Sequence, residues 1–341
     1  MQDVTWTGAA FVAAGTSREG EFAIAESTDG RTWRSMSIGR APASLVELSA
    51  GPNGVVAVGT IGDRSFSWYS PDALHWTEPA AFPQPRSDDV SVRTTDVVAT
   101  PNGWLAVGRA DPGTGIAVNL RPIRALIWTS TDGLRWSLAE PQPSLTQAGI
   151  NAVAAVEGGF VAAGTRGTRA AIWTSADGTT WTETLDDPMF RPPADVDEAW
   201  VTANAVAAAR GSIVVVGTAY GVGEGGAPAA RAWWSTEDGG WREAVVELPE
   251  VGQPSEVAAT SERFLATGPS WPDMSSCLGG IWGSTDGAMW RCEATDPGFS
   301  GFVAHGAAGS VTVEVVVGAT RADGMGTLPG DTYAIWRPVA P

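Results

Sequence analysis

The tryptophans of this chain recur at fixed spacing, and this regularity limits the possible folds more than any other feature. Six copies of one segment each end in a Trp, and in five of them a second Trp stands eight residues earlier. With Trp336 of a partial seventh copy, these positions hold twelve of the seventeen tryptophans. A large aromatic repeated in this way is typical of packing between repeated units, so we do not assign these side chains to a binding site.

Each copy also contains four short apolar runs separated by turns. In the fourth copy they are 150–156, 160–164, 171–174 and 180–184. Ala-Val runs without clean alternation indicate strands that are buried on both faces, as in a blade packed between two neighbours. The sequence therefore predicts an all-β, single-domain β-propeller of four-stranded antiparallel blades. We expect seven blades with an incomplete last one, and six blades is the alternative. The expected blades span approximately 1–38, 39–80, 90–140, 148–186, 200–247, 254–295 and 301–337.

A turn of the form Ser-x-Asp-Gly-x-x-Trp precedes the last strand of most blades. Asp and Ser side chains can accept hydrogen bonds from turn amides, and Gly supplies a positive φ. Six equivalent positions around a ring cannot all serve one site, so we assign these aspartates a structural role. They are Asp29, Asp72, Asp132, Asp177, Asp238 and Asp286.

These turns resemble the Asp-box, or BNR, repeat of the sialidase-like propeller superfamily, in a form that is one residue shorter. The resemblance covers nearly the whole chain and implies a fold but no single activity, because that superfamily includes glycosidases, sorting receptors and assembly factors. A sialidase also needs an Arg cluster and a Tyr paired with Glu. The segment at 190–193 matches the Arg motif poorly, and Tyr220 has only Glu224 nearby. Sialidase activity is therefore not expected, and the sequence leaves open whether the chain is an enzyme.

The two faces of the predicted ring differ in loop length. The spacing between the paired aromatic positions is eight residues in all six complete copies, whereas the spacing from the second to the third strand ranges from 9 to 20. Variable loops on one face of a repeat protein are its usual binding surface. We therefore place function on the variable-loop face.

Candidate ligand-binding residues follow from that choice. The variable loops carry the aromatics Phe190, Trp200, Tyr220 and Trp271, which could stack on a sugar or anchor a protein. The full candidate set is Arg191, Asp195, Trp200, Tyr220, Trp271 and His305, the last on an innermost strand that faces the channel. The acidic loop with Asp186, Asp187, Asp195 and Asp197 could hold Ca²⁺, although a solvated loop is the simpler interpretation.

The charge and the cysteines limit partners and location. A net charge of −17 argues against nucleic acid, whose binding needs clustered basic residues. Cys277 and Cys292 flank one predicted hairpin, where they could form a disulfide. We expect an extracellular or cell-envelope monomer without a transmembrane segment, from whose sequence a signal or anchor has been removed.

Three functions remain open. The first is a non-catalytic propeller that binds a glycan or a protein on its variable-loop face. The second is a carbohydrate-active enzyme, a glycosidase or lyase, that uses acidic residues in the central pocket. The third is an assembly or scaffold factor.

Overall fold

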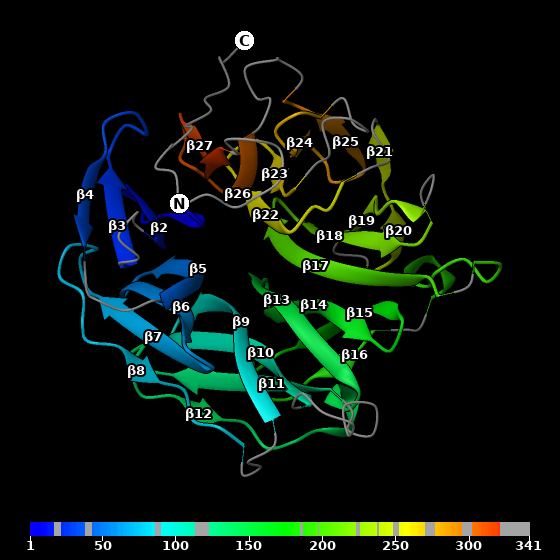
Figure 1. Ribbon diagram of the computed structural model, residues 1–341, viewed down its shortest axis with the longest axis horizontal. Coiled ribbons are helices and arrows are strands. Elements are labelled where there is room, and N and C mark those ends of the chain that lie inside the picture. Colours follow the sequence, from blue (N-terminus) through cyan, green and yellow to red (C-terminus); the bar gives the residue numbers. More distant parts are fainter. Residues whose placement is uncertain are drawn as a thin grey trace.

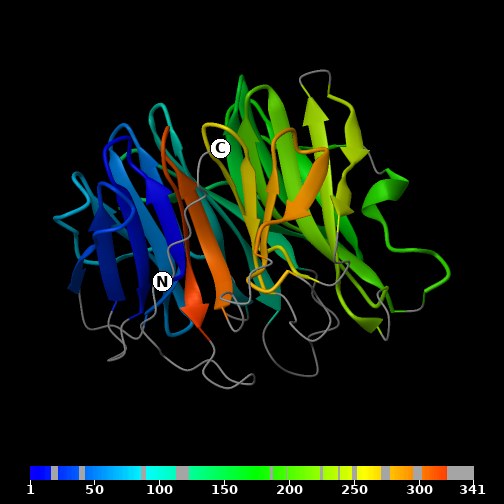
Figure 2. The same ribbon diagram turned by 90° about the horizontal axis from the view of Figure 1, so that it is seen from above.

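The chain folds into antiparallel sheets arranged around a central axis (Figure 1). This computed structural model describes residues 1–16, 22–37, 43–85, 90–112, 123–184, 187–196, 198–222, 226–236, 239–247, 252–269, 277–294 and 302–320. Strands dominate these residues, and the two helices among the named elements are the single 3₁₀ turns η2 (Pro143–Leu145) and η3 (Pro188–Phe190). Seen from the side, the sheets stand next to one another around the ring (Figure 2).

Blades 1 to 3 each consist of four consecutive strands, with the first strand innermost. The strands of blade 1 are β1 (Asp3–Trp6), β2 (Phe11–Thr16), β3 (Phe22–Ser27) and β4 (Arg34–Ser37). Those of blade 2 are β5 (Ala43–Gly51), β6 (Gly54–Ile61), β7 (Arg64–Ser70) and β8 (Ala80–Ala81). Those of blade 3 are β9 (Val90–Thr100), β10 (Gly103–Pro112), β11 (Arg124–Ser130) and β12 (Ser137–Leu138).

Blades 4 and 5 repeat this order, but blade 6 gains a fifth strand. Blade 4 contains β13 (Ala148–Val156), β14 (Gly159–Arg166), β15 (Arg169–Ser175) and β16 (Thr182–Glu183). Blade 5 contains β17 (Trp200–Ala209), β18 (Ser212–Tyr220), β19 (Ala229–Thr236) and β20 (Trp241–Glu243). Blade 6 contains β22 (Glu256–Ala259), β23 (Phe264–Thr267), β24 (Ile281–Ser284) and β25 (Met289–Cys292). The segment that leaves blade 5, β21 (Val245–Glu247), pairs in parallel with β25, which the sequence pattern did not predict.

A seventh sheet, β26 (Phe302–Gly309) with β27 (Glu314–Thr320), contacts β1 and β22 and so lies between blades 1 and 6. The number of complete blades is thus the six of the alternative and not the seven of the main prediction, because this last sheet has only two described strands. The third strand that we expect near Trp336 lies outside the described residues.

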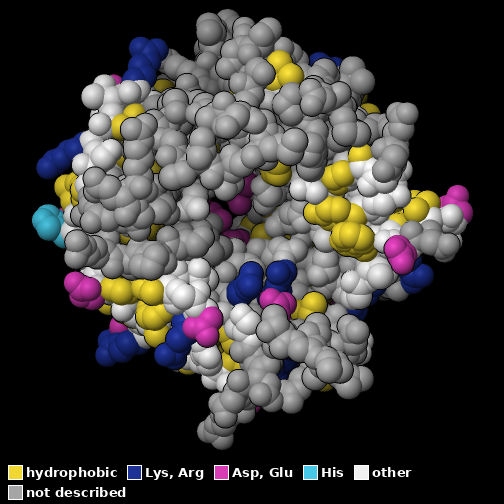
Figure 3. All heavy atoms as spheres, in the orientation of Figure 1, with side chains coloured by type: hydrophobic (Ala, Val, Ile, Leu, Met, Phe, Trp, Pro, Cys, Tyr) yellow, Lys and Arg dark blue, Asp and Glu magenta, His cyan; other side chains and the backbone are white. Residues whose placement is uncertain are grey.

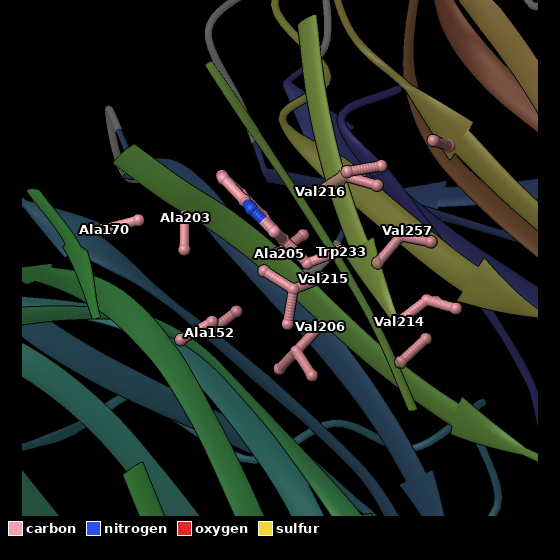
Figure 4. Packing of buried hydrophobic residues seen from close by; sticks show 14 of the residues in the cluster. Ala152, Ala170, Ala203, Ala205, Val206, Val214, Val215, Val216, Trp233 and Val257 are labelled. Atoms are coloured by element: carbon pink, nitrogen blue, oxygen red, sulfur yellow. The ribbon is translucent and has the colours of Figure 1, made fainter. Parts of the chain in front are cut away.

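Buried side chains fill the wedges between neighbouring blades. The cluster between blades 4, 5 and 6 contains Val206, Val215 and Trp233 (Figure 4). Three of the third-strand tryptophans inside such clusters donate their indole N–H to the segment that links two blades. Trp128, Trp173 and Trp233 donate to the carbonyl oxygens of Pro83, Ser144 and Met189, at 2.9, 3.0 and 3.2 Å. The repeated Trp is therefore a packing residue, because both its ring and its N–H are used inside the fold.

One hairpin of blade 6 carries a covalent link. Cys277 and Cys292 form a disulfide with a Cα–Cα distance of 5.5 Å, between the two residues that flank the expected hairpin. No helix in the described part of the chain has the length and apolar character needed to span a membrane.

Candidate functional site

The innermost strands present one equivalent position to the centre of the ring. In each of the seven sheets it lies opposite the residue that precedes a glycine on the second strand, as Asp96 lies opposite Val107 before Gly108. Four of the seven positions hold an acid and three hold Ala or Gly. In chain order they are Asp3, Glu47, Asp96, Ala152, Ala205, Glu256 and Gly306.

A β-bulge fixes this position in the sheet. The pairing slips between Ile150 and Ala152 in blade 4, and the same slip occurs in blades 2, 3 and 5 and in the seventh sheet. Glycine is required on the second strand, because a Cβ at Gly164 would overlap the carbonyl oxygen of Gly149. In blade 3 the bulge residue Thr95 and the acid after it, Asp96, both line the channel.

A cavity of about 230 Å³ occupies the centre of the ring. Glu47, Asp96 and Glu256 line it together with the bulge residues Thr95, Asn151, Asn204 and His305 and with Ser255, which precedes Glu256. Acidic side chains are visible at the central opening in the space-filling view, with basic side chains beside them (Figure 3). The bulge residues precede the equivalent position by one residue and so lie nearer the start of the innermost strand. The innermost strands start at the variable-loop face. The cavity therefore opens on the face where the loop lengths place function.

Two of the acids connect neighbouring blades. Asp3 accepts hydrogen bonds from its own blade at Val4 N (2.6 Å) and from blade 2 at Leu48 N (2.7 Å). Asp96 does the same with Val97 N (2.6 Å) and Val153 N (2.7 Å). Both oxygens of each carboxylate thus accept backbone amides, which fixes the position of the acid and joins two blades.

The bulge residues form a second set of links between blades. Thr95 Oγ1 donates to Ile150 O at 2.8 Å, and Asn151 Nδ2 donates to Ala203 O at 2.9 Å. Asn204 Nδ2 continues the series to Pro254 O at 2.8 Å. The channel rim between blades 3 and 6 is therefore a chain of polar side chains held in place by hydrogen bonds, as a preformed binding site requires.

Asp3 and Glu47 act as a pair. Burial raises the pKa of Asp3 to about 6, against the lowering effect of a hydrogen bond from Glu47 and of the amides. Burial, followed by the negative charges of Asp3, Glu256 and Asp96, raises the pKa of Glu47 well above its ordinary value. The two carboxyl groups are joined by a hydrogen bond, so they titrate as a coupled pair. Asp3 is only 4% exposed and is absent from the cavity lining.

Asp96 and Glu256 are the remaining pair, and both line the cavity. Burial raises the pKa of Asp96 to about 7, although the amides of Val153 and Val97 oppose the shift. Burial, together with the charges of Asp3 and Asp96, raises the pKa of Glu256 well above its ordinary value. Among the described residues, Glu256 accepts a hydrogen bond only from Val257 N, at 3.3 Å. A carboxyl group whose pKa is raised well above its ordinary value thus lines the same cavity as one that titrates near neutrality.

Trp200 and Tyr220 form an aromatic stack above the rim on blade 5. They pair across β17 and β18, and their rings lie 4.6 Å apart at an interplanar angle of 13°. Trp200 is 44% exposed. Two residues further along β17, Thr202 bonds to Asn204 of the rim at 2.6 Å, so the stack and the rim share one face of the sheet.

Of the other sequence candidates, His305 reaches the channel, and the rest lie apart from it or outside the described residues. His305 lines the cavity and is exposed. Arg191 and Asp195 are exposed in the segment after η3. Trp271 lies outside the described residues. Phe190 was expected to be exposed but is 3% exposed, because it packs on Trp233 at 5.4 Å.

The acidic loop between blades 4 and 5 contributes a cap. Asp187 accepts a hydrogen bond from Met189 N at 3.0 Å and so begins η3. Asp186 and Asp197 lie outside the described residues. In the rest of the described chain, no group of three His, Cys, Asp or Glu side chains could hold a metal ion.

The turn aspartates lie on the constant face and bond to their own turns. Asp29 Oδ1 accepts Arg31 N and Thr32 N, both at 2.7 Å, and Ser27 Oγ donates to it at 3.0 Å. The turns at Asp72, Asp132, Asp177 and Asp286 repeat this arrangement, while Asp238 lies outside the described residues. The side-chain oxygens of these aspartates are used within the turn, which leaves the channel as the candidate site.

Larger cavities exist elsewhere, but fewer titratable side chains line the two described next. Cavities of about 460 and 480 Å³ are lined by residues of blades 3 and 4 away from the axis, and each contains a single carboxyl group, Glu140 or Asp177. Volume alone does not identify a site, whereas several titratable groups with shifted pKa values at one place favour it.

The ring of blades and its central acidic cavity define the chain as a β-propeller with a channel site. The sequence matches no known family model and no curated protein. Among solved structures, a protein from Lactobacillus plantarum is similar at 12% identity and a TM-score of 0.51, over 78% of this chain and 76% of that one. The α-L-arabinanase of Penicillium chrysogenum, in complex with arabinobiose, is similar at 14% identity and a TM-score of 0.50, over 85% and 91%. At these identities the likeness shows the fold.

Proposed function

We propose that the protein binds a saccharide at the channel mouth and cleaves a glycosidic bond there. The observation that carries this proposal is the pair Asp96 and Glu256, two carboxyl groups with raised pKa values that reach one cavity. Glycosidases need one carboxyl group that holds a proton and one that carries charge. Binding without catalysis is the other function open to this face, and the experiment below separates the two.

The two carboxyl groups take different roles. Glu256 protonates the glycosidic oxygen as the bond from that oxygen to the anomeric carbon breaks. Asp96, ionised and fixed by two amides, accepts the proton of the water that adds to the anomeric carbon. Glu47 and Asp3 are hydrogen-bonded to each other, and Asp3 also joins blades 1 and 2 through Leu48 N.

The flanking stack supplies binding. A flat, exposed Trp200 backed by Tyr220 offers an apolar face to a sugar ring above the channel. The rim amides of Asn151 and Asn204 offer polar groups to sugar hydroxyls. The arabinanase similarity makes arabino-oligosaccharides the first compounds to test.

The Cys277–Cys292 disulfide favours an oxidising environment. We therefore place the protein outside the cytoplasm, in the cell envelope or the medium. A saccharide polymer is accessible to an enzyme there. The Asp-box resemblance of the turns is compatible with such an enzyme, because glycosidases occur in that superfamily.

The test compares Glu256→Gln with the wild type on a panel of arabino-oligosaccharides and other plant and bacterial oligosaccharides. Hydrolysis is followed by the release of reducing ends, and binding by calorimetry. We expect Glu256→Gln to lower kcat by about 10²- to 10⁴-fold, as the loss of a general acid does, while binding persists.

Trp200→Ala is expected to raise KM by roughly tenfold, a stacking loss of about 1.4 kcal/mol, with a smaller effect on kcat. Asp177→Asn, on the opposite face, is the matched control and should change neither constant. Hydrolysis that survives in Glu256→Gln contradicts the assigned acid. Binding by the wild type without any hydrolysis would reject the enzyme and leave the glycan-binding function.

A further inference from the structure

We infer that the saccharide bound at the channel carries an anionic group, a carboxylate or a sulfate ester, which Arg93 and Arg109 bind beside the channel mouth. This inference rests on the proposed function and names the class of its substrate. It comes from an arrangement of charges on blade 3 that neither packing nor ion pairing accounts for.

The two arginines face each other on neighbouring strands. Arg93 on β9 is the direct partner of Arg109 on β10. Like charges at directly opposite positions in a sheet are destabilising. A single carboxylate, Asp111, lies between them, 3.2 Å from Arg109 Nε and 4.0 Å from Arg93 Nε. Two guanidinium groups thus share one carboxylate, and an added anion would complete the balance.

Both guanidinium groups remain accessible. The Arg93 side chain is 62% exposed and that of Arg109 is 35% exposed. They line a cavity of about 540 Å³, which shares Thr95 and Asn151 with the channel cavity. A saccharide with one residue at the channel acids could therefore place its neighbour at the arginines. A guanidinium is the side chain best suited to bind the planar carboxylate or the sulfate oxygens of such a residue.

Arg109 is also held toward the channel. Its Nη1 donates to Asn151 Oδ1 at 3.4 Å, and the amide of Asn151 is fixed in turn by Ala203 O at 2.9 Å. Among the described residues that line this cavity the one acid is Asp63, on the turn after β6, and it forms no ion pair with either arginine. Burial raises the pKa of the channel carboxyls Glu47 and Glu256 well above their ordinary values, which weakens their repulsion of an anionic ligand.

The experiment measures the affinity of the full chain for matched oligosaccharides of equal length, using oligogalacturonides, neutral galacto-oligosaccharides and sulfated galacto-oligosaccharides. We expect the wild type to bind an anionic member at least tenfold more tightly than the neutral one, and the gain to shrink as salt rises. If oligogalacturonides bind more tightly than sulfated galacto-oligosaccharides, the anionic group is a carboxylate, and the reverse order identifies a sulfate.

The variants are Arg93→Gln and the double variant Arg93→Gln/Arg109→Gln, each checked for an unchanged unfolding midpoint. In the double variant the ratio of the two affinities should fall to near one, and Arg93→Gln should lower it in part. Arg64→Gln, an exposed arginine of β7, is the matched control that keeps the ratio. Equal affinities of the wild type for anionic and neutral oligosaccharides, or an affinity ratio that is unchanged in the double variant, would overturn the inference. The proposed function would still stand if the wild type hydrolyses a neutral oligosaccharide. Binding of none of the three saccharides would overturn the inference together with the saccharide assignment on which it rests.

Discussion

Aspartates serve two regions of this propeller, the turns on the constant face and the innermost strands at the channel, and their pKa values shift in opposite directions. In the turns, hydrogen bonds donated by the backbone amides of Thr32 and Arg31 lower the pKa of Asp29 to about 2. At the channel, burial raises the pKa of Asp96 to about 7, although it too accepts two amides. Each carboxylate accepts two backbone amides, yet the pKa shifts are opposite, because water solvates the exposed turn carboxylate, whereas burial disfavours the charged form of Asp96.

The difference also separates structure from chemistry. The described turn aspartates form their hydrogen bonds within their own turns, so the aspartates of different blades do not interact with one another. The channel acids feel one another's charge, as Glu47 does with Asp3, Glu256 and Asp96. Coupled carboxyl groups divide protons unequally, and that division supplies an acid and a base at the same pH.

The largest expected effect comes from removing a channel acid that links blades. Asp3→Ala leaves the buried amides of Val4 and Leu48 without an acceptor and Glu47 without its partner. Each such loss costs about 1 to 3 kcal/mol, so we expect the free energy of unfolding to fall by about 4 kcal/mol. Urea unfolding of Asp3→Ala and Asp3→Asn measures it, and Asp3→Asn, which keeps an acceptor oxygen, should lose less. A loss below about 1 kcal/mol in Asp3→Ala would show that the two amides find other partners.

The repeat made most of the fold predictable from the sequence. The paired tryptophans, such as Trp173 and Trp181, set the phase of the strands, and the constant spacing between them identified one face. The pairing of β21, which follows blade 5 in the sequence, with blade 6 was not predicted, because a strand of three residues carries no periodic signal. The burial of Phe190 was missed because its partner, Trp233, comes from another part of the chain.

The channel acids carried a signal that went unused. In four copies an acid stands directly before Val or Leu on the first strand, as in Asp3-Val4, Glu47-Leu48, Asp96-Val97 and Glu256-Val257. Aligning the copies on the second-strand glycine, rather than on Trp, would have shown it. Their shifted pKa values could not be predicted, because these depend on how many carboxyl groups the ring brings together.

The pH dependence of stability sharpens the comparison, with an expected size on the order of 3 kcal/mol for each of the two carboxyl groups that shift. Asp3 and Asp96 have raised pKa values in the folded state, so the native protein binds more protons than the unfolded chain between about pH 4 and 7. Stability from these groups is complete below pH 4 and is lost as pH rises through 6 and 7. The turn aspartates act in the reverse sense, and their contribution is lost as pH falls from about 4 toward 2.

Urea midpoints from pH 3 to 8 should therefore peak on the acidic side of neutrality. Asp96→Asn, which cannot ionise, should flatten the decline between pH 5 and 7 without changing the acid limb. A decline of unchanged slope in Asp96→Asn would mean that other groups produce it.

The smallest effect is expected in a single turn, and it tests whether the repeated aspartates are separate from function. Asp177 Oδ1 accepts Thr179 N at 2.8 Å and Thr180 N at 2.7 Å, on an exposed turn where water can replace a lost acceptor. Asp177→Ala should therefore lower the free energy of unfolding by less than about 1 kcal/mol and leave saccharide binding unchanged. Because the turns do not contact one another's aspartates, adding Asp132→Ala should give a loss equal to the sum of the two single changes, measured by urea unfolding. A loss well above that sum, or a change in binding, would show that the turns are coupled through the blades to the channel, and the division between the two regions would then fail.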